Sequence, residues 1–250
     1  MECAVAAGLV ELAGAALDGP AVALVAQRAE VEAVGMPCGV MDQMASVLCR
    51  AGHALHLDTR SLAFDNVPFE PGARGLALVV LDTRAPRRLV EAAYAERRAD
   101  CAAAAARIGV PSLRDASIDR LEAASLDPRS YRRARHVLTE NARVQAFVEH
   151  LRTDDWNALG GLLTSSHASL RDDFEVSSPE LDEAVAAALD AGALGARMTG
   201  AGFGGCAIAL APVGAADDVV AHVVEAFERH DLGSPVAFTV IPVDGARRIA

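Results

Sequence analysis

A chain of 250 residues, 52% of them hydrophobic and 23% charged, can bury a large core in one large domain or two small ones. Its formal net charge of −11 disfavours a nucleic-acid surface, because phosphate binding needs cations that are not outnumbered. All 23 basic residues are arginine, which excludes a phosphate-loop lysine, a Schiff base and a pyridoxal anchor.

The cysteines and the N-terminus indicate the compartment. The five cysteines form no CxxC pair, so neither a disulfide framework nor a zinc site is predicted, and a reducing cytoplasm fits best. The sequence shows neither a signal peptide nor an apolar stretch of about 20 residues, the length of a membrane span. We expect a soluble cytoplasmic protein without a membrane partner.

The first part of the chain is predicted to hold three helices and two short strands. Apolar spacing places the helices at 2–17, 21–34 and 40–48, and the strands at 54–58 and 61–67. Met1 opens directly into the helical pattern without a capping residue, as if the chain began inside an element. Prolines and Gly72 then interrupt the regular pattern, and we place a domain boundary after residue 72.

The second part is predicted to be richer in helices. Helices are expected at 86–108, 128–151, 154–170, 179–191 and 215–229, with Ser178 capping the fourth of these. Strands are expected at 75–81, 196–198, 206–210 and 236–243. This order of strands and helices predicts an α+β fold with domains at 1–72 and 73–250.

Two carboxylates of the first part are candidates for chemistry. Asp42 follows a Gly- and Pro-containing turn at the start of a helix, where it could act as a general base or be an ordinary carboxylate favoured by the helix dipole. Glu30 could bind a hard divalent cation or be a solvated helix residue.

A glycine-rich loop, Gly200 to Gly205, is the candidate in the second part. Its bare backbone suits close approach by a sugar or a phosphate. A dinucleotide-binding fingerprint would require a helix next, whereas the following residues read as a strand. A structural tight turn between two strands is the other interpretation.

Basic residues gather at Arg129, Arg132, Arg133, Arg135 and His136. They could meet phosphate or an acidic partner, but a solvated helix face is the favoured interpretation. His167 lies on an apolar helix, and we expect a packed residue rather than a catalyst.

Longer strings carry more information than these single residues. They are Gly35 to Gln43, Gly52 to Leu62, Tyr131 to Val137, Ser166 to Ser177, Pro179 to Asp182 and Arg197 to Cys206. Together they resemble galactokinases of the GHMP small-molecule kinase family over essentially the whole chain. Several are specific to galactokinases rather than to the wider family.

The resemblance implies roles for individual residues. Asp42 matches the catalytic aspartate, which interacts with the C1 hydroxyl of galactose as it attacks the γ-phosphate of ATP. Glu30 matches the magnesium-ligating glutamate and Tyr94 the sugar-contacting tyrosine. Gly200 and Gly202 lie in the third family motif, beside the active site, and are expected to contact substrate. The implied cofactor is Mg²⁺, with ATP as co-substrate and galactose as acceptor.

The resemblance also implies a GHMP kinase fold, with the remnant of an S5-like N-terminal α/β domain followed by a ferredoxin-like α/β C-terminal domain. A monomer is expected from the intact family. The implied reaction makes galactose 1-phosphate. The alternatives are a kinase for arabinose, galacturonate or N-acetylgalactosamine, and a non-catalytic galactokinase-like sugar sensor.

One departure from the family qualifies these roles. Galactokinases carry an arginine-containing first motif and then a Gly- and Ser-rich phosphate loop, and this sequence contains neither. Met1 to Ala4 resembles the continuation of the helix that follows that loop. We therefore expect an N-terminally truncated member, from a fragmentary gene or a misassigned gene start, that phosphorylates no sugar as it stands and exposes apolar faces of its first helices.

Overall fold

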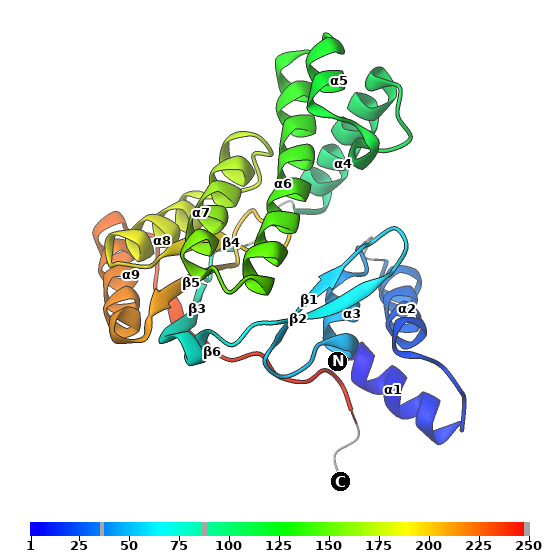
Figure 1. Cartoon of the computed structure of the whole chain (residues 1–250), viewed down its shortest axis with the longest axis horizontal. Coiled ribbons are helices and arrows are strands. Elements are labelled where there is room, and N and C mark those ends of the chain that lie inside the picture. Colours follow the sequence, from blue (N-terminus) through cyan, green and yellow to red (C-terminus); the bar gives the residue numbers. More distant parts are fainter. Residues whose placement is uncertain (36–37, 87–89, 248–250) are drawn as a thin grey trace. The chain divides into compact units, whose positions relative to one another are not determined.

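The computed structural model describes residues 1–35, 38–86 and 90–247, and the chain divides into two compact units (Figure 1). Met1–Glu70 and Ile241–Ala250 form the first unit, and Pro71–Val240 form the second. The division falls close to the boundary expected after residue 72. The sequence did not indicate that the end of the chain returns to the first unit.

The first unit holds helices and one β-hairpin. Its elements are α1 (Glu2–Leu12), α2 (Gly19–Ala29), a π-helical turn η1 (Glu30–Val34), α3 (Met41–Leu48), β1 (His53–Leu57) and β2 (Phe64–Pro68). The two strands pair antiparallel, with His53 opposite Pro68. Helix α1 ends before the expected residue 17, and Gly14 follows shortly with a left-handed φ of 59° that turns the chain away.

Small apolar clusters hold the first unit together, and two of them lie among the described residues. Cys3 and Ala6 of α1 are buried with Val22 and Ala26 of α2, and Met44 of α3 is buried in a second cluster that reaches β1. Large apolar side chains remain exposed on the other faces of the helices, with exposed fractions of 54% for Val5, 60% for Leu9 and 86% for Leu12. The exposure expected from the sequence is therefore found on α1.

The second unit is built on a four-stranded antiparallel sheet. Its strands are β3 (Leu76–Asp82), β4 (Gly195–Met198), β5 (Cys206–Pro212) and β6 (Val236–Val240), in the order β4-β5-β3-β6. Within this unit, β3 comes first in sequence and lies between β5, the third strand, and β6, the fourth, which is the ferredoxin-like order. This agrees with the fold that the resemblance implied.

Among the residues that the structure describes, six helices belong to this unit. They are α4 (Val90–Ile108), α5 (Ile118–Ala123), α6 (Pro128–Arg152), α7 (Trp156–Asp172), α8 (Pro179–Asp190) and α9 (Ala216–His230), with short 3₁₀ turns η2 (Pro71–Arg74), η3 (Leu113–Asp115) and η4 (Val213–Ala215). Helix α5 was not expected, and residues 87–89 of the expected helix at 86–108 lie outside the described residues. Ser178 caps α8 as predicted, accepting a hydrogen bond from the Leu181 N–H at 3.3 Å.

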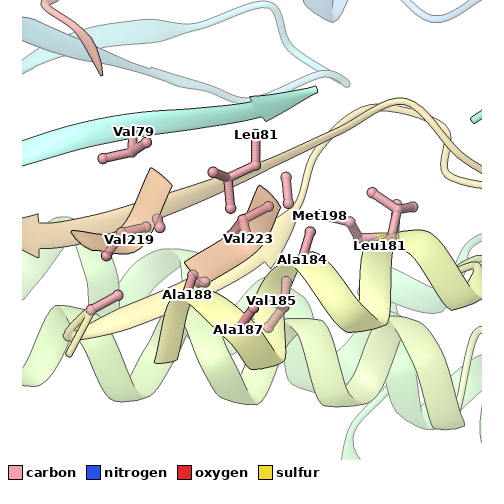
Figure 2. Packing of buried hydrophobic residues seen from close by; sticks show 14 of the residues in the cluster. Val79, Leu81, Leu181, Ala184, Val185, Ala187, Ala188, Met198, Val219 and Val223 are labelled. Carbon is pink, nitrogen blue, oxygen red and sulfur yellow. The ribbon is translucent and has the colours of Figure 1, made fainter. Parts of the chain in front are cut away.

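The core of the second unit lies between the sheet and helices α8 and α9. Figure 2 shows Val79 of β3, Ala184 and Ala188 of α8 and Val223 of α9 within one cluster, and all four are fully buried. Alanines on α8 bring the helix backbone close to the sheet, while burial of each larger side chain contributes roughly 1.5–3 kcal/mol. Among the described helices, not one combines the length and the apolar character of a membrane span.

Two neighbouring glycines of α7 provide a test of this packing. A Cβ atom on Gly160 would lie 2.1 Å from the carbonyl oxygen of Leu194, whereas a Cβ atom on Gly161 would meet no atom within 4 Å. We expect Gly160→Ala to lower the free energy of unfolding by about 1–3 kcal/mol or more through overpacking. Gly161→Ala should raise it by roughly 0.5–1 kcal/mol through helix propensity. Urea unfolding of both variants measures the difference, and equal effects would contradict the backbone contact.

Candidate active site

The glycine loop, residues 199–205, joins β4 to β5 in an unusual backbone conformation. Positive φ angles occur at Gly200 (79°), Gly202 (86°), Phe203 (58°), Gly204 (118°) and Gly205 (89°). Glycine adopts such angles freely, whereas Phe203 does so against its preference. Because strand β5 follows the loop, the dinucleotide-binding interpretation is wrong, as the sequence indicated.

Both ends of the loop are anchored to the sheet. The Thr199 N–H donates to the Cys206 carbonyl at 2.9 Å. Thr83, which is 2% exposed, donates to the Gly205 carbonyl through its N–H at 3.0 Å and through Oγ1 at 2.7 Å. Sequence reasoning missed Thr83, whose only signal was its position directly after a buried strand.

The middle of the loop rests on the segment Asp173–Val176, which follows α7. The Phe203 N–H donates to the Val176 carbonyl oxygen at 2.7 Å. A Cβ atom on Gly202 would lie 2.1 Å from the same oxygen. The loop therefore needs glycine at position 202 for space as well as for its φ angle.

The arginines of α6 hold this segment in place. Arg132 and Arg133 donate to the carboxylate of Glu175 at 2.8 and 2.6 Å, and Arg135 pairs with Asp173. Arg133 is only 1% exposed. The predicted solvated helix face is thus wrong for Arg133 and His136, which are buried, whereas Arg129 and Arg135 remain exposed.

His136 of α6 also contacts this segment and the end of α7. Its ring stacks on Phe174 at a centroid distance of 4.5 Å, and its Nδ1 lies 3.0 Å from Ser169 Oγ. Ser169 donates its hydroxyl proton to Asp173, so we infer that Nδ1–H of His136 donates to the Ser169 oxygen. Burial lowers the pKa of His136 to about 4, which makes the imidazole neutral at pH 7.

His167 is a packed residue, as the sequence predicted. It is 3% exposed, and its Nδ1 accepts the Met198 N–H at 3.2 Å while Nε2 lies 3.1 Å from an oxygen of Asp182. The ring joins α7, β4 and α8 just before the glycine loop. It therefore supports the frame of the loop.

Tyr94 and Arg97 lie one turn apart on α4, and so on one face of it. Tyr94 is half-buried. Arg97, which sequence reasoning missed, is 9% exposed and donates to the carbonyl oxygens of Phe174 and Glu175. The second unit thus brings the candidate tyrosine's helix and the glycine loop onto the same segment.

In the first unit, Asp42 lies in the first turn of α3 and is exposed. The helix dipole favours a carboxylate at this place. Met36 and Pro37, in the preceding turn, lie outside the described residues. The role of Asp42 as a base stays a prediction.

Gln43 connects the Asp42 turn to Glu30. Its Nε2 donates to Glu30 Oε2 at 2.7 Å, and the side chain is 2% exposed. Its Oε1 is buried without a hydrogen-bond partner in the part of the chain that the structure describes. Glu30 opens η1, and π-helical turns are frequent at functional sites.

The donor chemistry at Glu30 fits Mg²⁺. This ion prefers hard oxygen ligands and commonly takes one or two carboxylates together with waters and substrate phosphates. No group of three or more His, Cys, Asp or Glu side chains with metal-binding geometry occurs among the described residues.

Comparison with known proteins identifies the family. The family model "GHMP kinases N terminal domain" matches residues 1–50, and "GHMP kinases C terminal" matches residues 146–229, so that the two together cover more than half of the chain. The chain belongs to the GHMP kinase family. Solved GHMP kinases share its fold at lower identity, for example the L. major mevalonate kinase in complex with R-mevalonate, with a TM-score of 0.59 and 22% identity over 95% of this chain and 63% of that one.

Within the GHMP kinases, this chain is similar to galactokinases. It is 46% identical to the galactokinase of Streptomyces coelicolor over 100% of this chain and 65% of the relative, and 41% identical to that of Homo sapiens over 90% and 57%. The crystal structure of Lactococcus lactis galactokinase complexed with galactose matches 99% of this chain and 65% of that one, with 31% identity and a TM-score of 0.92. The chain thus spans less than two thirds of the length of these relatives.

The pH dependence of stability tests the contacts of Glu175. Hydrogen bonds from Arg133, followed by those from Arg132, lower the pKa of this carboxyl from an ordinary 4.5 to about 2. Ionised Glu175 therefore contributes stability that is fully present above about pH 4.5 and is lost as the pH falls toward 2. We expect the free energy of unfolding to fall less steeply below pH 4.5 in Glu175→Gln than in the wild type. Glu228→Gln, an exposed substitution on α9, is the control and should retain the wild-type slope.

Proposed function

We propose that the chain forms the greater part of an ATP-dependent kinase that phosphorylates the C1 hydroxyl of galactose and yields galactose 1-phosphate. The observation that carries the proposal is the similarity to the Lactococcus lactis galactokinase complexed with galactose, with a TM-score of 0.92 over 99% of the chain. The identity of 46% to the Streptomyces coelicolor galactokinase supports the same acceptor.

In this proposal, Asp42 acts as the general base. Phosphoryl transfer depends mainly on positioning and on charge stabilisation, so the protein has little covalent chemistry to perform. The Asp42 carboxylate would accept the proton of the C1 hydroxyl and orient its oxygen toward the γ-phosphate. Its exposed place at the start of α3 leaves it accessible to a substrate.

Glu30 would hold Mg²⁺, and Gln43 would orient Glu30. The bound ion would neutralise charge on the phosphates. The buried amide of Gln43 fixes Glu30 Oε2 by a hydrogen bond of 2.7 Å, and so restricts the directions that the carboxylate can take. A fixed carboxylate is a better ligand than a mobile one, because less conformational entropy is lost on binding.

The glycine loop and Tyr94 would contact substrate. Gly200 and Gly202 have positive φ angles and no side chain, which suits close approach of a substrate to the loop backbone, although the Val176 oxygen fills the side of Gly202 where a Cβ atom would lie. Tyr94 would supply a ring and a hydroxyl to the sugar. These roles rest on matching residues in the galactokinase strings.

An assay of a chimera tests the function. The chain is placed in the Streptomyces coelicolor galactokinase instead of the region that it matches, and the product is assayed with Mg-ATP and galactose, arabinose, galacturonate or N-acetylgalactosamine. We expect turnover with galactose at a kcat in the usual enzyme range of about 1–10³ s⁻¹. Asp42→Asn in the chimera should lower kcat by at least about a hundredfold, because a positioned base contributes roughly 10²–10⁴-fold.

Thermal melting and the 250-residue chain itself provide the controls. An Asp42→Asn chimera that melts like the parent chimera shows that the loss of activity is chemical. Preference for another sugar, or galactose binding by a folded chimera without turnover, would contradict the proposal. For the 250-residue chain alone we expect no turnover, because it spans only 65% of the Streptomyces coelicolor galactokinase, and activity at an ordinary rate would refute this expectation.

A further inference from the structure

A single carbonyl group holds the middle of the glycine loop. The Val176 oxygen accepts the Phe203 N–H at 2.7 Å and occupies the space where a side chain at position 202 would lie. A shift of Val176 would therefore either break the hydrogen bond or press on Gly202. The position of the segment Asp173–Val176 consequently sets the position of the middle of the loop.

Arg97 fixes this segment from the side of α4. Its Nε donates to the Phe174 carbonyl at 2.7 Å, and its Nη2 donates to the Glu175 carbonyl at 2.9 Å. The guanidinium carbon also lies 6.0 Å from the centroid of the Phe203 ring, at the outer range of a cation–π contact. One buried guanidinium thus contacts both the segment and the loop that rests on it.

The contact depends on the shape of the guanidinium as well as on its charge. Two consecutive carbonyl groups are bound by two different nitrogens of a planar fork, which lysine cannot reproduce with its single ammonium group. Glu175 also has a left-handed φ of 54°, an unfavourable conformation for a residue with a side chain, so its carbonyl needs external support to stay in place.

We propose that Arg97 is a positioning residue that sets the glycine loop for the ligand it receives. Because Arg97 lies one turn from Tyr94 on α4, it also fixes the position of the loop relative to that tyrosine. The functional part of this proposal rests on the proposed function, in which the loop and Tyr94 contact the sugar. The conformational part stands on the contacts alone.

A purely structural role would have a different signature. The main core of the second unit consists of the sheet with α8 and α9, and Arg97 lies outside that cluster. Glu175 has further anchors in Arg132 and Arg133. Loss of Arg97 should therefore loosen the segment and the loop while the core stays folded.

Hydrogen–deuterium exchange of the 250-residue chain tests the proposal without any need for activity. We compare Arg97→Ala and Arg97→Lys with Arg98→Ala, which removes an exposed arginine from the next position of α4. In both Arg97 variants we expect exchange at Phe203 and Val176 to accelerate roughly tenfold or more, since the two hydrogen bonds of the guanidinium fork are lost. Exchange in β3 and β5 should stay unchanged, and Arg98→Ala should match the wild type.

Chemical rescue of the Arg97→Ala variant shows whether the loop needs the planar shape of the guanidinium or only its positive charge. Millimolar ethylguanidinium should restore protection of the loop in Arg97→Ala, whereas ethylammonium should not. Unchanged exchange at Phe203, uniform acceleration throughout the second unit, or full protection in Arg97→Lys would overturn the proposal. If Arg97→Ala fails to fold, Arg97→Lys, which retains the charge and the aliphatic stem, carries the same comparison.

A kinetic measurement then tests the functional part. In the chimera described above, Arg97→Lys should lower kcat/KM for galactose at least tenfold at an unchanged Tm, and Arg98→Ala should not. Wild-type kcat/KM in an Arg97→Lys chimera would overturn a role in positioning. A wild-type chimera without turnover contradicts the proposed function instead, and the exchange measurement then decides the role of Arg97.

Discussion

The glycine loop of the second unit depends on the contact of its middle residues with the Val176 carbonyl. This one oxygen accepts the Phe203 N–H and leaves no room for a side chain at position 202. Around it, the structure places arginines from two helices, with Arg97 from α4 and Arg132 and Arg133 from α6. The number of anchors is large for a four-residue segment, and a small displacement of this segment would displace the glycine loop that rests on it.

These contacts also explain why α6 carries a cluster of like charges. A cluster of like charges on one helix usually faces solvent or an anionic ligand. Here, by contrast, Arg133 is almost fully buried and its carboxylate partner lies beyond the next helix. Removing one member of such a pair leaves a buried charge unpaired, so these residues favour one arrangement of the segment more than they add net stability.

The sequence predicted the helices and strands of the second unit well, because their apolar periodicity is strong and proline or a capping residue marks several boundaries. Helix α1 was predicted too long because the apolar spacing continues past Gly14, where the backbone turns left-handed. The candidate residues Asp42, Glu30 and Tyr94 came from resemblance to galactokinases. Gln43, Thr83 and Arg97 were missed, because their importance lies in contacts between distant segments that no local pattern records.

Residue-resolved amide exchange in the wild-type chain tests the central claim most directly. Phe203 lies in a loop, and its ring is only partly buried. If no hydrogen bond held this loop in place, its amide hydrogens would exchange almost as fast as those of an unfolded peptide. If the Val176 carbonyl holds the loop, the Phe203 amide is protected to a degree comparable with the amides of β5. Exchange of Phe203 at the rate of an unprotected peptide, alongside a protected β5, would contradict the account.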